Sequence, residues 1–289
     1  MKIILSRKGF DSQYGGKPSP ILPNGQLVPL PIPSRHDKFT LSDINFPKID
    51  IHKLAADLSR GRYGANTRVH LDPDLSREPS SRIPGWRPAL GQTGNAQSHL
   101  NSEGVGKNDL FLFFGWFRMV ECRNGVWRYI TKAPDLHVIF GWLEVGDVLP
   151  IVQDRSGCLK RYPWIADHPH VSDPKQYNDP RNTLYIAAQR SRLAQRRGPG
   201  GGRFEKFHEH LVLTRPGSSR STWSLPGWFM PTDHRVPLSY HRNTALWKRA
   251  GNKATLKSVA KGQEFVLHAN SYPTVKVNNW VERMFEVRR

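Results

Sequence analysis

Apolar and aromatic residues gather in the middle of the chain in runs that are typical of β-strands. Residues 109–117 and 137–149 are rich in phenylalanine, tryptophan and β-branched residues, and residues 127–130 follow an Asn-Gly pair. Strands of this kind, separated by short turns, favour an antiparallel meander or barrel. Shorter apolar runs predict further strands at residues 3–5, 183–187, 207–214 and 261–267.

Helical patterns are few. Residues 50–58 carry apolar side chains at helical spacing and predict a short helix, and residues 91–100 could begin another. Residues 18–33 contain six prolines, which exclude a helix or a central strand and predict an extended or edge ribbon. We therefore expect one α+β domain over residues 1–289, mostly antiparallel β, with long decorated loops and a few short helices.

The composition argues against a membrane protein, a secreted protein and a cysteine-rich protein. No apolar run approaches the ~20 residues that a membrane span needs, and the N-terminus lacks the pattern of a signal peptide. The two cysteines provide neither a disulfide framework nor a cysteine-only zinc site. These features predict a cytoplasmic protein that makes no use of membranes.

The excess of positive charge indicates the kind of molecule that the protein binds. The net charge is +19, and residues 151–289 hold 24 Lys+Arg against 10 Asp+Glu. An excess of this size is typical of proteins that bind nucleic acid, because phosphates are the commonest polyanion in the cytoplasm. We expect DNA contacts at two basic segments of this half, each of which could instead be only a solvated loop or helix face. The contact residues expected there are Arg190, Arg192, Arg196, Arg197, Tyr240, His241 and Arg242.

The loop after the first predicted strand concentrates chemically active groups. Arg7 and Lys8 would attract an anionic ligand, and Asp11 and Tyr14 follow within one turn. Glycines on both sides of Asp11 allow positive φ and close approach of the backbone to a ligand. The alternative is an ordinary solvated turn.

Residues 104–150 resemble the PUA-like barrels that include the ASCH, EVE and YTH folds. The resemblance lies in Gly-x-x-Asp-Leu-Phe-Leu-Phe-Phe, followed by Val-Ile-Phe-Gly-Trp-Leu-Glu-Val-Gly. It implies a barrel core and a cleft that receives an extruded or single-stranded base on aromatic side chains. Trp116 is the expected stacking surface, whereas Phe114 and Trp142 are expected in the core.

A more specific resemblance covers most of the chain. The opening MKIILSRKGFDSQYGGKPSPILPNGQLVPLPIP, with LDPDL, GQTGNAQSHL, DLFLFFGWFR and HVIFGWLEVG, is similar to the third of the nucleotide-modification-associated domain families. These are bacterial and viral proteins proposed to act with enzymes that make, recognise or attack hypermodified DNA bases. The resemblance therefore implies a role with modified DNA.

If the protein acts on modified DNA, its carboxylates are candidates for catalysis. Breaking an N-glycosidic bond needs a carboxylate that stabilises an oxocarbenium-like sugar or activates water, and a donor to the departing base. Asp11 is the expected carboxylate, with Tyr14 and His99 as donors. Asp72 and Asp74 are alternatives, although Asp-Pro-Asp is also an ordinary turn.

Amide side chains can read the edge of a base because they donate and accept at once. Gln92 and Gln97 are expected to do so beside Trp116, although Gln97 could instead belong to the first turn of a helix. Arg7, Lys8 and Arg118 are expected to contact DNA.

Two histidine pairs, at residues 168 and 170 and at residues 208 and 210, suggest a metal. A zinc site needs a third or fourth ligand at a recognisable spacing, and none is evident. Motifs for nucleotide cofactors are also absent. We therefore expect neither a metal nor a cofactor.

These features together predict a DNA glycosylase. It would extrude a modified pyrimidine, including a glycosylated one, and hydrolyse its N-glycosidic bond in defence against phage. A non-catalytic reader of modified bases and an enzyme that builds the modification are the alternatives.

Overall fold

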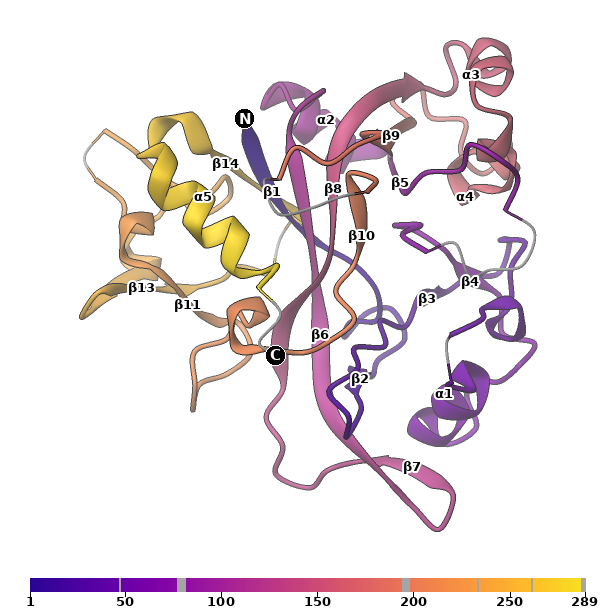
Figure 1. Cartoon of the computed structure of the whole chain (residues 1–289), viewed down its shortest axis with the longest axis horizontal. Coiled ribbons are helices and arrows are strands. Elements are labelled where there is room, and N and C mark those ends of the chain that lie inside the picture. The colour runs from indigo at the N-terminus through magenta and orange to yellow at the C-terminus, as the bar shows by residue number, and fades with distance from the viewer. Residues whose placement is uncertain (47, 77–81, 194–197, 233, 261, 287–289) are drawn as a thin grey trace.

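The computed structural model of the chain describes all residues except 47, 77–81, 194–197, 233, 261 and 287–289. Its centre is a nine-stranded sheet built around two long antiparallel strands, β6 (Leu110–Arg123) and β8 (Leu136–Pro150) (Figure 1). Consecutive residues of both strands are buried, which is why their sequences read as near-continuous apolar runs.

The main path of this sheet runs β14-β1-β6-β8-β9-β5. Strand β1 is parallel to β6, and the other neighbours on the path are antiparallel. Three short strands join at the sides: β2 and β7 pair with β6, and β10 pairs with β8. The bounds of these strands are β1 Lys2–Arg7, β2 Ser19–Ile21, β5 Ala89–Gln92, β7 Val126–Tyr129, β9 Thr183–Ala187, β10 Gly201–Arg203 and β14 Glu264–His268.

Two smaller sheets and several helices complete the chain. A three-stranded antiparallel sheet has the order β11-β13-β12, and β3 pairs with β4. The bounds of these strands are β3 Ile32–Pro33, β4 Val69–His70, β11 Thr222–Pro226, β12 Trp247–Ala250 and β13 Lys253–Lys257. The α-helices are α1 Ile51–Ser59, α2 Gly94–Ser102, α3 Arg155–Arg161, α4 Pro169–Ser172 and α5 Thr274–Arg283. The 3-10 helices are Leu41–Asp43, Pro163–Asp167, Glu209–Leu211, Gly227–Phe229, Thr244–Leu246 and Ala269–Ser271.

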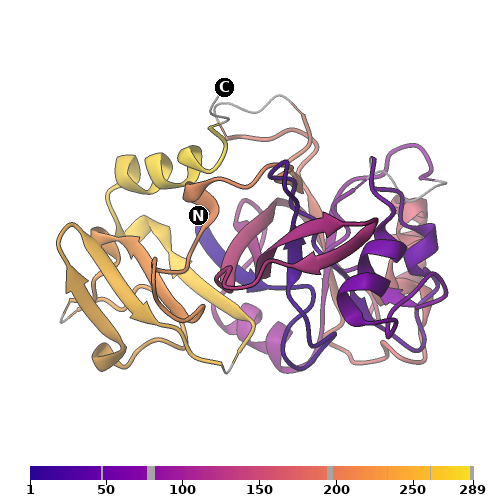
Figure 2. The ribbon, with the colours of Figure 1, turned by 90° about the horizontal axis from the view of Figure 1, so that it is seen from below.

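The small elements lie at opposite ends of the large sheet. Figure 2 shows the three-stranded sheet and α5 at one end and α1 at the other. The main hydrophobic core joins the large sheet, the three-stranded sheet and α5, whereas a second core lies beneath α1 and a third beneath α3. None of the described helices is long and apolar enough to cross a membrane.

The prediction of an α+β fold with mostly antiparallel strands is confirmed, but a closed barrel is not formed by the residues that the structure describes. Other segments cover the two end strands of the path. Asp74 bridges to Ala89 at the edge of β5, and Ser239 N–H donates to Val266 O of β14 at 3.0 Å. Because these segments occupy the edges, β5 and β14 do not meet.

Most predicted elements are present, including α1 and the proline-rich ribbon, which supplies β2 and β3. The prediction of a strand over residues 207–214 is wrong. This segment contains a 3-10 helix and then single bridges from Val212 to Val138 of β8 and from Thr214 to Trp223 of β11. It crosses from one sheet to another, so it pairs along neither.

Candidate functional site

A polar cavity of about 400 Å³ opens where β1, β4 and β5 end. Its wall combines the loop after β1, the segment after β4, the start of α2 and α4. Two other cavities, of about 520 and 510 Å³, are larger, but we call this one the main cavity because it holds several of the predicted site residues. Its lining includes Arg7, Asp11, His70, Asp72, Gln92 and His170.

The loop after β1 brings Asp11 and Tyr14 to the main cavity. Gly15 has φ +84°, and a Cβ there would overlap the ring of Phe10, so this position needs glycine. The prediction of positive φ in this loop is therefore met. Asp11 Oδ1 accepts hydrogen bonds from the backbone N–H groups of Gln13 and Tyr14, both at 2.7 Å. With Oδ1 held by the turn, Oδ2 is the oxygen that can serve a ligand.

Lys8 differs from its predicted role. Its side chain is 9% exposed, and its ammonium lies 3.5 Å from Asp72 Oδ2 and 3.6 Å from Glu264 Oε1. It is the cation of a buried ion-pair network at the floor of the main cavity, so it cannot contact DNA phosphates as the sequence suggested.

Asp72 is the centre of this network. Its Oδ1 accepts the backbone N–H of Gly91 at 2.6 Å, and His168 Nε2 lies 3.5 Å from the same oxygen. Burial acts to raise the pKa of Asp72, but the Lys8 ammonium and His168 outweigh it and hold that pKa well below its usual range. The carboxyl group is therefore ionised throughout the physiological range.

Gln92 lines the main cavity, as predicted for a residue that reads a base, but both ends of its amide are engaged. Nε2 donates to Glu264 Oε1 at 2.6 Å, and Oε1 accepts the N–H of Thr93 at 3.2 Å. Burial raises the pKa of Glu264, against the lowering effects of Lys8, Ser6 and Gln92. Gln92 thus connects the cavity wall to a buried carboxyl group.

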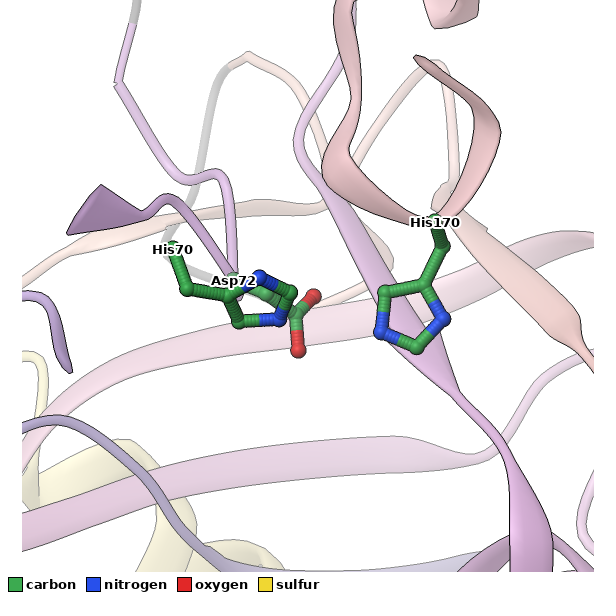
Figure 3. Close-up of side chains that lie close together, drawn as sticks. All are labelled: His70, Asp72 and His170. Carbon is green, nitrogen blue, oxygen red and sulfur yellow. The ribbon is translucent and has the colours of Figure 1, made fainter. Parts of the chain in front are cut away.

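Three potential metal ligands meet in the main cavity. One ligand atom from each of His70, Asp72 and His170 lies within 4.8 Å of the others, and Figure 3 shows the Asp72 carboxylate between the two imidazoles. The sequence predicted no metal because no third ligand stood near a histidine pair. His170 lies about a hundred residues from the other two, and only the packing of α4 beside β5 brings it there. The sequence held two signals, the histidine pair that contains His170 and the i, i+2 spacing of His70 and Asp72, but nothing that connected them.

A second cavity of about 320 Å³ adjoins the main one and shares Arg7 and Asp11 with it. Trp116, the predicted stacking residue, lines this second cavity rather than the main one. The guanidinium of Arg220 lies 4.0 Å from the Trp116 ring centre, so one face of the ring is already covered. Arg7 itself is anchored by hydrogen bonds to the backbone carbonyls of residues 259 and 260.

Other predicted site residues support the fold around the cavities. His99 binds Ser239 Oγ at 2.9 Å and packs against Tyr240, outside both cavities. Gln97 is 1% exposed and donates to the hydroxyl of Tyr185. Gln97 and His99 lie two residues apart on α2, and their contacts with β9 and with the segment before β14 engage both side chains, so neither lines a cavity.

The predicted DNA contacts separate into buried and exposed groups. His241 is fully buried and accepts the backbone N–H of Val259, so the prediction that it contacts DNA is wrong. Arg118 is half-buried; it donates to the carbonyl of Ile130 and pairs with Asp135 at 3.8 Å. Tyr240 and Arg242 remain exposed.

The predicted basic loop is described only in part. Arg190 and Arg192 are both exposed, and Arg192 forms an ion pair with Glu144 at 3.6 Å. Arg196 and Arg197 lie outside the described residues.

Comparison with protein families agrees with the resemblance found in the sequence. The model of nucleotide modification associated domain 3 matches residues 2–268. Neither a curated protein nor a solved structure matches the chain. Because the family match spans all fourteen strands that the structure describes and both cavities, the chain belongs to the nucleotide modification associated domain 3 family.

Proposed function

We propose that this protein binds DNA that carries modified bases, receives an extruded modified nucleotide in the main cavity and hydrolyses its N-glycosidic bond. Membership of a family associated with nucleotide modification and a net charge of +19 support the choice of partner. The volume of the main cavity, about 400 Å³, lies in the range of small-molecule pockets. Removal of modified bases from phage DNA would make the protein a defence enzyme.

The observation that carries this proposal is the placement of Asp11 and Tyr14 on one loop at the wall of the main cavity. A carboxylate there can stabilise the positive charge that develops on the sugar, or activate water, as the base departs. The turn holds Asp11 Oδ1 with two backbone N–H groups, which fixes the carboxylate before the substrate binds. Tyr14 is 50% exposed, and its phenol can donate to the departing base.

The test compares Asp11→Asn with Asp50→Asn. Asp50 caps α1 by accepting the Lys53 N–H at 2.9 Å, lines neither cavity, and can be replaced by asparagine, an equally good N-cap. Asp11→Asn should reduce base release from modified DNA about a hundredfold or more while DNA binding stays within a few-fold, because the missing charge acts mainly in the transition state. Asp50→Asn should release base at the wild-type rate. Full activity of Asp11→Asn would remove Asp11 from the mechanism.

A non-catalytic reader of modified bases is the second candidate. One observation favours it: each carboxylate that lines the cavity already has a structural task. Asp11 caps its own turn, Asp72 is paired with Lys8, and Asp37 is hydrogen-bonded to His70. A reader would bind modified DNA more tightly than unmodified DNA and release no base. The same paired measurement of binding and base release separates the two functions.

A further inference from the structure

The histidine and aspartate side chains at the floor of the main cavity are arranged as a ligand set. His70 ends β4, Asp72 follows two residues later, and His170 lies in α4. One potential ligand atom from each lies within 4.8 Å of the others, and the Asp72 carboxylate sits between the two rings (Figure 3). Two imidazoles and one carboxylate form the protein ligand set of many catalytic zinc and non-haem iron sites.

Both imidazoles are oriented by a hydrogen bond at Nδ1. His70 Nδ1 lies 3.0 Å from Asp37 Oδ2, and His170 Nδ1 lies 2.8 Å from Asn182 Oδ1. The Asn182 amide nitrogen donates to the carbonyls of His170 and Tyr177, which fixes its oxygen toward the His170 ring. A carboxylate and an amide oxygen only accept, so each Nδ1 carries the hydrogen and each Nε2 has a free lone pair. Metal-binding histidines are held in this way in many proteins.

The carboxylates near the floor of the main cavity have more oxygen atoms than the described residues satisfy with hydrogen bonds. Asp37, Asp72 and Glu264 are all buried, and Lys8 is the cation paired with two of them. Within the described part of the chain, Asp37 Oδ1 and Glu264 Oε2 are buried and have no hydrogen-bond partner. A divalent cation beside Asp72 would compensate this negative charge.

Gly91 contacts two of the three proposed ligands, His170 and Asp72. An ideal Cβ on Gly91 would overlap Cδ2 of His170, so only glycine leaves room for this ring against β5. The Gly91 N–H also donates to Asp72 Oδ1, whereas Oδ2 faces the Lys8 ammonium at 3.5 Å. Gly91 is therefore a positioning residue for Asp72 and His170.

We propose that His70 Nε2, Asp72 and His170 Nε2 bind one divalent transition-metal ion, such as Zn²⁺ or Fe²⁺, with coordination positions open to the main cavity. Three protein ligands leave room for water or for an atom of a cavity ligand. The site does not depend on the proposed base release, because a metal can serve a reader or an enzyme. It replaces the sequence-based expectation that no metal binds.

The first experiment measures metal uptake. Protein treated with a chelator and then dialysed against Zn²⁺, Mn²⁺ or anaerobic Fe²⁺ should retain about one equivalent of at least one metal by elemental analysis. Asp72→Asn and His170→Ala should retain less than about a tenth of that amount, and Gly91→Ala, which keeps every ligand, should also lose most of it. His52→Ala is the matched control, because His52 Nδ1 lies 2.8 Å from Asp50 Oδ1 on the exposed side of α1, with no third ligand among the described residues. Failure of wild type to retain any of the metals would overturn the proposal, as would undiminished uptake by Asp72→Asn or Gly91→Ala.

The second experiment uses the wild-type chain alone, so it does not depend on how the variants fold. Long-range ¹H–¹⁵N spectra recorded during Zn²⁺ titration should show two of the twelve histidines coordinating through Nε2 while their Nδ1 stays protonated. Coordination by no histidine, or through Nδ1, would contradict the geometry. Both measurements report binding, so their failure and the failure of base release can be told apart.

Discussion

At the scale of single residues, the loop after β1 depends on its glycines as much as on its polar side chains. Asp11 and Tyr14 reach the main cavity because the chain turns tightly over the ring of Phe10, which is 2% exposed. Gly15 and Gly16 both have positive φ, but only at Gly15 would a Cβ meet the Phe10 ring. The two glycines therefore provide a matched pair for separating backbone strain from steric conflict.

We expect Gly15→Ala to lower the free energy of unfolding by about 2–4 kcal/mol, from the left-handed backbone and the overlap with Phe10 together. Gly16→Ala, which meets no atom within 4 Å, should lower it by only about 1 kcal/mol. Urea denaturation of both variants measures the difference. Equal losses would show that the loop can move away from Phe10 and that Asp11 is not rigidly held.

At the scale of elements, one buried histidine joins the two larger sheets. His137 in β8 accepts the indole N–H of Trp223 in β11 at Nδ1, 3.0 Å away. Burial, with help from Arg7 and Arg220, lowers the pKa of His137 to about 3. The neutral ring is needed there, because a protonated Nδ1 would face the indole donor with a second hydrogen.

Stability should therefore fall with acidification. The unfolded chain binds a proton at His137 near pH 6.5, whereas the folded chain resists protonation down to about pH 3. The contribution of His137 is complete above pH 6.5 and is lost as the pH falls toward 3, with a slope of at most about 1.4 kcal/mol per pH unit. His137→Asn keeps an acceptor without a titrating group and should flatten the dependence between pH 6.5 and 4. Denaturation curves with the same slope for variant and wild type would refute this assignment.

The sequence correctly predicted the elements in which neighbouring residues all favour the same secondary structure. The aromatic runs of β6 and β8 and the helical spacing of α1 needed no knowledge of distant contacts. Residues 207–214 look like a strand, but their bonding is divided between two sheets. The predicted barrel is not closed because irregular segments pair with the edges of β5 and β14, so these two strands do not pair with each other.

At the scale of the whole molecule, the site combines loop residues that sequence could identify with a floor that it could not. Asp11 and Tyr14 are neighbours in sequence, so one loop revealed both. Glu264 and His170 reach the floor only after β14 pairs with β1 and α4 packs beside β5. Lys8 was identified as a DNA contact because sequence shows its charge but not the two carboxylates that bury it.

The net charge of +19 is also a property of the whole molecule. DNA affinity should fall steeply with salt, because each phosphate that is bound releases counterions. Replacing Arg190, Arg192, Arg196 and Arg197 by alanine should reduce the slope of log affinity against log salt by up to about 0.9 for each phosphate that is no longer bound. The control is Arg123→Ala/Arg128→Ala in the β6–β7 hairpin, where both cations pair with Glu121. An unchanged slope in the four-arginine variant would place DNA on another surface.

Base release by the wild-type protein tests the central claim most directly. Duplexes that differ only in one hypermodified pyrimidine are incubated with the protein, and alkali then cleaves the strand wherever a base has been removed. We predict cleavage at the modified position alone, and its loss in Asp11→Asn. Intact strands from every modified duplex, under conditions where the protein binds them, would contradict the assignment as a glycosylase and leave a reader of modified DNA.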